Sequence, residues 1–188
     1  TVLTRTLEEE GILISYTDEV SSLPADFEVP ASDLLIVYTP AIPANAVLLN
    51  YFLDNGFNLK KRSQVLGIIS KGQFCIAVAG THGKTTTSSI VAHILTDSGY
   101  GCTAFLGGIA TNYQSNFLLG DNHVVVVEAD EYDRSFLTLH PDIAVITSMD
   151  ADHLDIYGDA EQLHESFHLF AQQLKTGGVL FFKKGLPL

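Results

Sequence analysis

Residues 80–87 have the composition and spacing of a loop that binds phosphate groups, and they read Gly-Thr-His-Gly-Lys-Thr-Thr-Thr. Gly80 and Gly83 permit backbone angles that other residues avoid, so successive N–H groups can converge on phosphate oxygens. Lys84 supplies a positive charge for the β- and γ-phosphates, and the Thr85 hydroxyl is an oxygen ligand of the kind that Mg²⁺ prefers. The pattern therefore predicts a site for a nucleoside triphosphate.

The loop is shorter than the common form, in which four residues separate the first glycine from the Gly-Lys-Ser/Thr end. Val78 stands where that first glycine would be. An ordinary strand-to-helix turn is the alternative interpretation, but it leaves Lys84 in the first helical turn, where the helix dipole disfavours positive charge. The residues that we expect to hold the phosphates are Gly80, Thr81, His82, Gly83, Lys84, Thr85 and Thr86.

Acidic residues follow two other apolar runs, and ligands bind beyond such strand ends in open α/β sheets. Glu128 directly follows one run, and its carboxylate would complement Thr85 as a second Mg²⁺ ligand. His153 follows another run, among several aspartates, and is a further candidate metal ligand. Taken alone, an acidic segment at a strand end is more often a solvated loop than a metal site. Together with the Gly-rich loop they predict a metal-assisted phosphate site in which Lys84, Glu128 and His153 carry the chemistry.

Apolar runs alternate with helical patterns along the chain, which is typical of a parallel α/β sheet. We expect strands at residues 12–16, 34–37, 74–79, 103–106, 124–127, 143–147 and 179–182. We expect helices at residues 4–10, 46–55, 63–69, 84–96 and 160–174. The continuous valine run at 124–127 predicts a central strand that is covered on both faces. Gly107 and Gly108 are expected to form a flexible loop after their strand. A polar stretch at residues 70–73 separates two such patterns and predicts a domain boundary there.

The amino-acid composition limits the kinds of molecule that the protein is expected to bind. The 22 acidic and 10 basic residues give a formal net charge of −12, which argues against nucleic acid or an anionic membrane as a partner. A local phosphate site is compatible with this charge, because backbone N–H groups, one lysine and metal ions suffice. No apolar run is long enough to cross a bilayer. Cys75 and Cys102 lie in apolar runs, and we expect both to be reduced and buried.

The motifs together resemble those of the Mur ligases, and most of all the branch that joins L-alanine to UDP-N-acetylmuramate. The resemblance rests on residues 79–87, on Glu-Ala-Asp-Glu at 128–131 and on Asp-Ala-Asp-His-Leu-Asp-Ile-Tyr at 150–157. Phe-Leu-Gly-Gly at 105–108 adds to it, as does the stretch at residues 38–42. The histidine at position 82 is a specific mark of this branch and its close relatives. One departure is Thr-Ser at residues 147–148, where many family members have Thr-Asn.

The resemblance implies an α/β fold in two incomplete parts. Residues 1–70 would be the Rossmann-like remnant of an N-terminal domain that binds the UDP substrate, and residues 71–188 a truncated P-loop ATPase domain. The family's opening strand with its Gly-rich loop, and its third domain, have no counterpart in these 188 residues. We therefore expect a piece of a longer enzyme that is inactive on its own.

The resemblance also implies a cytoplasmic enzyme with ATP and Mg²⁺ as cofactors and with UDP-N-acetylmuramate and L-alanine as small-molecule substrates. ATP would convert the substrate carboxylate to an acyl phosphate, which the amine of L-alanine attacks. Thr85 and Glu128 would hold one Mg²⁺, and His153 would help to hold a second. Residues 39–42 and the Gly107-Gly108 loop would approach the UDP substrate.

Other interpretations remain open. Within the family, the branch that recycles the tripeptide L-alanyl-γ-D-glutamyl-diaminopimelate suits Tyr132 in the segment 128–133, whereas residues 152–157 suit the alanine-adding branch better. A non-catalytic nucleotide-binding module is a second possibility. A P-loop kinase or GTPase is disfavoured by the short loop and by the lack of an Asn-Lys-x-Asp motif. The sequence leaves the oligomeric state open.

Overall fold

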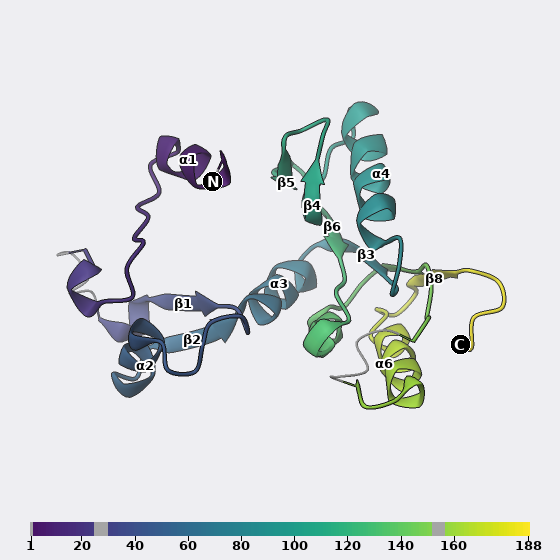
Figure 1. The fold of residues 1–188 in the computed structure, drawn as a ribbon. Coiled ribbons are helices and arrows are strands. Elements are labelled where there is room, and N and C mark those ends of the chain that lie inside the picture. Colours follow the sequence, from purple (N-terminus) through teal and green to yellow (C-terminus); the bar gives the residue numbers. More distant parts are fainter. Residues whose placement is uncertain (1, 25–29, 152–156) are drawn as a thin grey trace. The chain divides into compact units, whose positions relative to one another are not determined.

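The computed structural model describes residues 2–24, 30–151 and 157–188 (Figure 1). The chain divides into two compact units, Thr1–Val65 and Leu66–Leu188. The division falls inside helix α3 (Arg62–Lys71), a few residues before the polar stretch at residues 70–73.

The first unit has a small parallel sheet with a helical crossover. Its elements are α1 (Val2–Glu9), β1 (Leu35–Tyr38), α2 (Val47–Asp54) and β2 (Asn58–Lys61), with short 3-10 helices at Val20–Ser22 and Ala31–Asp33. Strands β1 and β2 pair in parallel, with α2 between them in the chain. The carboxylate of Asp18 accepts hydrogen bonds from the backbone N–H groups of Val47 (2.7 Å) and Leu48 (2.9 Å), which satisfies two donors at the start of α2.

One strand expected in this unit is wrong. Residues 12–16 have no regular secondary structure, and Leu13 within them is 83% exposed. An apolar run forms a strand only where a neighbouring strand satisfies its backbone groups, and in the described part of the chain this run has no such neighbour. Strand β2 was missed, because Asn-Leu-Lys-Lys carries a single apolar residue.

The second unit is a six-stranded sheet in the order β5-β4-β6-β3-β7-β8. Its strands are β3 (Phe74–Ala79), β4 (Thr103–Ala110), β5 (Ser115–Leu118), β6 (Val124–Glu128), β7 (Ile143–Ile146) and β8 (Val179–Phe182). Every neighbouring pair is parallel except β4 and β5, which are antiparallel. Because β3 lies between β6 and β7, the segments that follow these three strands meet at one edge of the sheet. The predicted parallel α/β fold is confirmed.

Helices cover both faces of this sheet (Figure 1). Helix α4 (Lys84–Asp97) packs on one face, where its Ala92 shares a buried cluster with Val124 and Val126. Helix α6 (Ala160–Gln172) and the 3-10 segment η3 (Tyr132–Thr138) contribute to the cluster on the other face, which holds Val125 and Val127. The valine run at 124–127 therefore lies in a central strand that is buried on both faces, as predicted.

The flexible loop expected at Gly107 and Gly108 is wrong, because β4 continues through both glycines to Ala110 and then turns back as β5. The expectation for the cysteines is confirmed, since Cys75 and Cys102 are free and buried. Burial raises the pKa of the Cys75 thiol to about 12. In the ranges that the structure describes, no helix combines the length and the apolar character needed to span a membrane.

Candidate phosphate-binding site

The Gly-rich loop joins the end of β3 to the start of α4. Gly80 has a φ of +133°, and Gly83, the residue before the helix, has a φ of +83°. Both values are unfavourable for residues with a side chain, which confirms the prediction for these two glycines. The helix begins at Lys84, so its positive end and the N–H groups of its first turn lie beside the loop.

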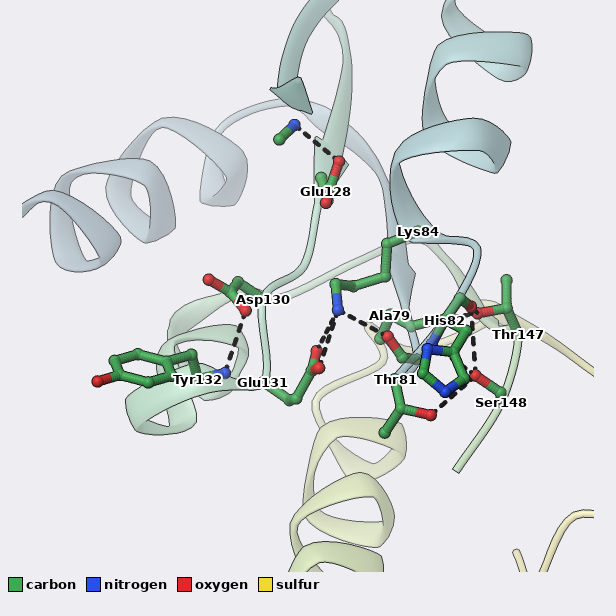
Figure 2. A network of polar contacts seen from close by, with 12 residues as sticks. Ala79, Thr81, His82, Lys84, Glu128, Asp130, Glu131, Tyr132, Thr147 and Ser148 are labelled. Carbon is green, nitrogen blue, oxygen red and sulfur yellow. Dashed lines mark hydrogen bonds and ion pairs between the residues drawn. The ribbon is translucent and has the colours of Figure 1, made fainter. Parts of the chain in front are cut away.

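The segment after β7 holds the loop in place (Figure 2). Thr147 Oγ1 lies within hydrogen-bond distance of the carbonyl oxygens of Ala79 (3.1 Å) and His82, which share its single hydroxyl proton. Ser148 Oγ accepts a hydrogen bond from the His82 N–H (2.7 Å) and lies 2.9 Å from Thr81 Oγ1. Ser148, the departure noted in the sequence, thus bonds directly to the loop. The protein makes all these contacts with its own groups, and they hold the loop in this shape.

Lys84 reaches back across the loop toward the segment after β6 (Figure 2). Its Nζ lies 2.8 Å from the carbonyl oxygen of Gly80 and 2.8 Å from each carboxylate oxygen of Glu131. The lysine side chain is 14% exposed and that of Glu131 is fully buried. Sequence reasoning missed Glu131 as a site residue. The available signal was its place as the last residue of the Glu-Ala-Asp-Glu motif at 128–131, three residues after Glu128.

Thr85 and Glu128 meet beside the lysine. Thr85 Oγ1 donates a hydrogen bond to Glu128 Oε1 (2.9 Å), and the Gly107 N–H donates to Glu128 Oε2 (2.7 Å). A Cβ at position 107 would lie 2.3 Å from Glu128 Oε1, so the glycine allows this carboxylate to approach β4. The structure therefore brings together Lys84 and Thr85 of the Gly-rich loop and Glu128 at the end of β6, two separate parts of the predicted site.

The donor set fits Mg²⁺ held jointly with phosphate. A hydroxyl and a carboxylate supply two hard oxygen ligands, and Mg²⁺ takes few protein ligands when phosphate oxygens and waters complete its shell. Among the described residues, no group of three His, Cys, Asp or Glu side chains could hold a metal ion by itself. The predicted ligand His153 lies outside the described residues.

The remaining loop residues have different surroundings. The His82 ring nitrogen Nε2 lies 3.9 Å from Asp150 Oδ2, and both side chains are largely exposed, so the interaction between them is weak. Thr81 is buried, and its hydroxyl also accepts a hydrogen bond from the Asp150 N–H (3.0 Å). Thr86 is exposed in the first turn of α4. Of the three side chains, those of His82 and Thr86 are open to a ligand.

A Gly-rich loop between a central parallel strand and a helix, with a lysine at the first helical position and a hydroxyl–carboxylate pair beside it, defines a P-loop nucleotide-binding α/β domain. The family model described as the Mur ligase middle domain matches residues 78–185, from the end of β3 to just beyond β8. The chain belongs to the Mur ligase family, as its motifs predicted.

Within the Mur ligase family, the chain is closely similar in sequence to ligases that carry one particular name. The chain is 53% identical over 187 residues to the UDP-N-acetylmuramate–L-alanine ligase of Flavobacterium psychrophilum. The match covers 100% of this chain and 41% of that protein. The chain therefore spans about two-fifths of the length of this relative.

Solved structures with the same fold come from both branches considered above. The ligase for UDP-N-acetylmuramate and L-alanyl-γ-D-glutamyl-meso-diaminopimelate from Neisseria meningitides superimposes with a TM-score of 0.83 at 24% identity, over 98% of this chain and 61% of that one. The UDP-N-acetylmuramate–alanine ligase of Thermotoga maritima gives a TM-score of 0.75 at 25% identity, over 98% and 45%. At this level of identity, the likeness to the Neisseria enzyme shows the fold alone.

Proposed function

We propose that this chain is the nucleotide-binding part of an ATP-dependent ligase that joins L-alanine to UDP-N-acetylmuramate in peptidoglycan synthesis. The observation that carries the proposal is the 53% identity to a protein of that name along the whole chain. The loop geometry supports it, because two glycines with positive φ and the contacts from Thr147 and Ser148 give the loop a shape that suits the phosphates of ATP.

The residues of the site suit the formation of an acyl phosphate. A carboxylate is a poor electrophile until one of its oxygens becomes a phosphate leaving group, so the enzyme must bring two anions together. The loop N–H groups and Lys84 would bind the ATP phosphates and offset that repulsion. Thr85 and Glu128 would hold Mg²⁺. When bound, the ion would neutralise further phosphate charge.

The first unit would contact the UDP part of the substrate, through residues 39–42 among others. Two features support this assignment. The unit holds a parallel βαβ arrangement, β1-α2-β2, of the kind that binds nucleotides beyond its strand ends, and residues 39–42 directly follow β1. The substrates are small molecules, and the proposed enzyme would work in the cytoplasm, where UDP-linked precursors are made.

The identity of the amine is tested by comparing two substrates. In a full-length enzyme that carries these residues, ATP and UDP-N-acetylmuramate are held at saturation, and L-alanine or the tripeptide L-alanyl-γ-D-glutamyl-diaminopimelate is added. We expect faster ADP formation with L-alanine. Faster turnover with the tripeptide would assign the chain to the recycling branch. If neither amine stimulates ADP formation, the chain is a nucleotide-binding module.

Substituting Glu128 with glutamine tests the metal assignment. The amide keeps the size of the side chain and can still accept the Gly107 N–H, so the fold is retained. Loss of a charged partner worth about 1.5–3 kcal/mol corresponds to roughly a tenfold to hundredfold weaker interaction. We expect the Mg²⁺ concentration that gives half-maximal turnover to rise by that factor. Glu161→Gln, on the exposed side of α6, is the control. An unchanged Mg²⁺ dependence in Glu128→Gln would contradict the assignment.

A further inference from the structure

The proposed function leaves one buried charge of the site without a role. Glu131 is fully buried, and it contacts the phosphate-loop lysine with both carboxylate oxygens. It lies 47 residues from Lys84 in the chain, so only the pairing of β3 with β6 brings the two together. Burial of a carboxylate is costly unless a cation compensates it, and a residue kept at that cost requires an explanation.

The backbone that carries Glu131 is fixed on both sides. Its carbonyl oxygen accepts hydrogen bonds from the Tyr157 hydroxyl and from the Arg134 N–H (2.9 Å). Asp133 and Arg134 both have left-handed backbone angles, with φ of 52° and 54°. Such angles are unfavourable for residues with a side chain and persist only where the surroundings impose them. Phe136, buried between α6 and the sheet, anchors the end of the turn. The carboxylate therefore points at the loop from a rigid support.

This support has a direct effect on Lys84. A free lysine side chain has about 2 kcal/mol of rotamer entropy, and the ammonium group has three donors. Here three oxygens lie 2.8 Å from Nζ: the Gly80 carbonyl and the two of Glu131. A phosphate oxygen can displace one of these three oxygens while Glu131 remains in contact with the ammonium group. These contacts place the lysine charge beside the loop.

We propose that Glu131 is a positioning residue that holds the ammonium group of Lys84 where the transferring phosphate develops charge; this inference rests on the proposed function. The negative charge of Glu131 also repels the triphosphate, so positioning and repulsion have opposite effects on ATP affinity. Repulsion acts in the transition state as well as in bound ATP, so it largely cancels from kcat, whereas a fixed lysine charge contributes more as charge develops on the transferring phosphate. Loss of the carboxylate therefore lowers kcat and leaves KM for ATP nearly unchanged.

The test compares Glu131→Gln with unmodified full-length enzyme. We expect kcat to fall at least roughly tenfold, which equals about 1.4 kcal/mol, while KM for ATP changes by less than about threefold. Asp130→Asn is the matched control, since Asp130 is exposed and caps the neighbouring Tyr132 N–H with an oxygen that asparagine retains. If Glu131→Gln does not fold, Glu131→Asp keeps the charge but withdraws it from Lys84, and its kcat is expected to fall as well. Unchanged kcat in the folded variant overturns the proposal.

A double substitution separates positioning from a general structural role. In a Lys84→Met background, Glu131→Gln is expected to change turnover by less than about twofold, because effects that act through one partner are not additive. A full further loss would show that Glu131 acts independently of Lys84 and would overturn the proposal.

A second readout does not depend on ligation. In enzyme labelled with ¹⁵N-lysine, the hydrogen-bonded ammonium of Lys84 is expected to give a slowly exchanging ¹H–¹⁵N signal, assigned by its loss in Lys84→Met. The signal should disappear in Glu131→Gln and remain in Asp130→Asn. Persistence in Glu131→Gln would overturn the inference. If the unmodified enzyme ligates no amine, the proposed function fails, and this signal still decides whether Glu131 positions Lys84.

Discussion

Substituting Lys84 with alanine is expected to lower ATP-dependent turnover by roughly a hundredfold to a thousandfold, the usual cost of removing one preorganised group that stabilises transition-state charge. The lysine is the only basic residue in the loop apart from His82, and its Nζ is held between Gly80 and Glu131. The measurement is phosphate release by the full-length enzyme at saturating UDP-N-acetylmuramate and L-alanine. Lys71→Ala, at the exposed end of α3, is the control. Wild-type turnover in Lys84→Ala would show that the loop does not bind the reacting phosphates.

The same substitution leaves Glu131 buried without its cation, so lost stability could be mistaken for lost catalysis. Breaking a buried pair by removing one partner costs about 3–5 kcal/mol. Lys84→Met combined with Glu131→Gln removes both charges and should recover much of that stability, but not the turnover. Thermal unfolding and turnover are both measured for the unmodified enzyme, for Lys84→Ala and for the double variant. The comparison separates lost stability from lost catalysis. Recovery of turnover in the double variant would contradict a direct role for Lys84.

Substituting Gly80 with alanine is expected to destroy the nucleotide site and destabilise the second unit. A Cβ at this position would lie 2.1 Å from Thr147 Oγ1 and 2.8 Å from the Ser148 backbone nitrogen. The φ of +133° adds backbone strain. Crowding and strain together should cost about 2–5 kcal/mol. The measurements are the free energy of unfolding in urea and the affinity for ATP.

Gly99→Ala is the matched control, because Gly99 also has a positive φ (+79°) but a Cβ added there would meet no atom within 4 Å. It lies at the other end of α4 and should show only the cost of backbone strain, about 1–2 kcal/mol, with ATP affinity unchanged. Equal losses of stability in the two variants would mean that Thr147 and Ser148 can move away from the loop. The inference that the segment after β7 fixes the position of the loop would then be wrong.

Several elements could be predicted because their signals are local. Strands β3 and β8 have the bounds that their apolar runs predicted, and α4 starts at the predicted residue. A continuous apolar run ended by polar or turn-forming residues needs no knowledge of its neighbours to be recognised. Residues 12–16 have the same local signal but no neighbouring strand in the described chain, so the prediction failed there. Strand β5 was missed because its pairing with β4 is set by the hairpin geometry rather than by its own composition.

The phosphate loop itself could be read directly, since Gly80, Gly83, Lys84 and Thr85 are almost contiguous and their chemistry follows from residue type. The residues that contact the loop could not be predicted from the sequence. Glu131 and Ser148 lie 47 and 66 residues from their contacts at Lys84 and His82, and no spacing rule connects them. They meet because β3 lies between β6 and β7 in a parallel sheet, which brings three strand ends to one edge. Strand order is a property of the whole packed unit, and it determined which carboxylate faces the lysine.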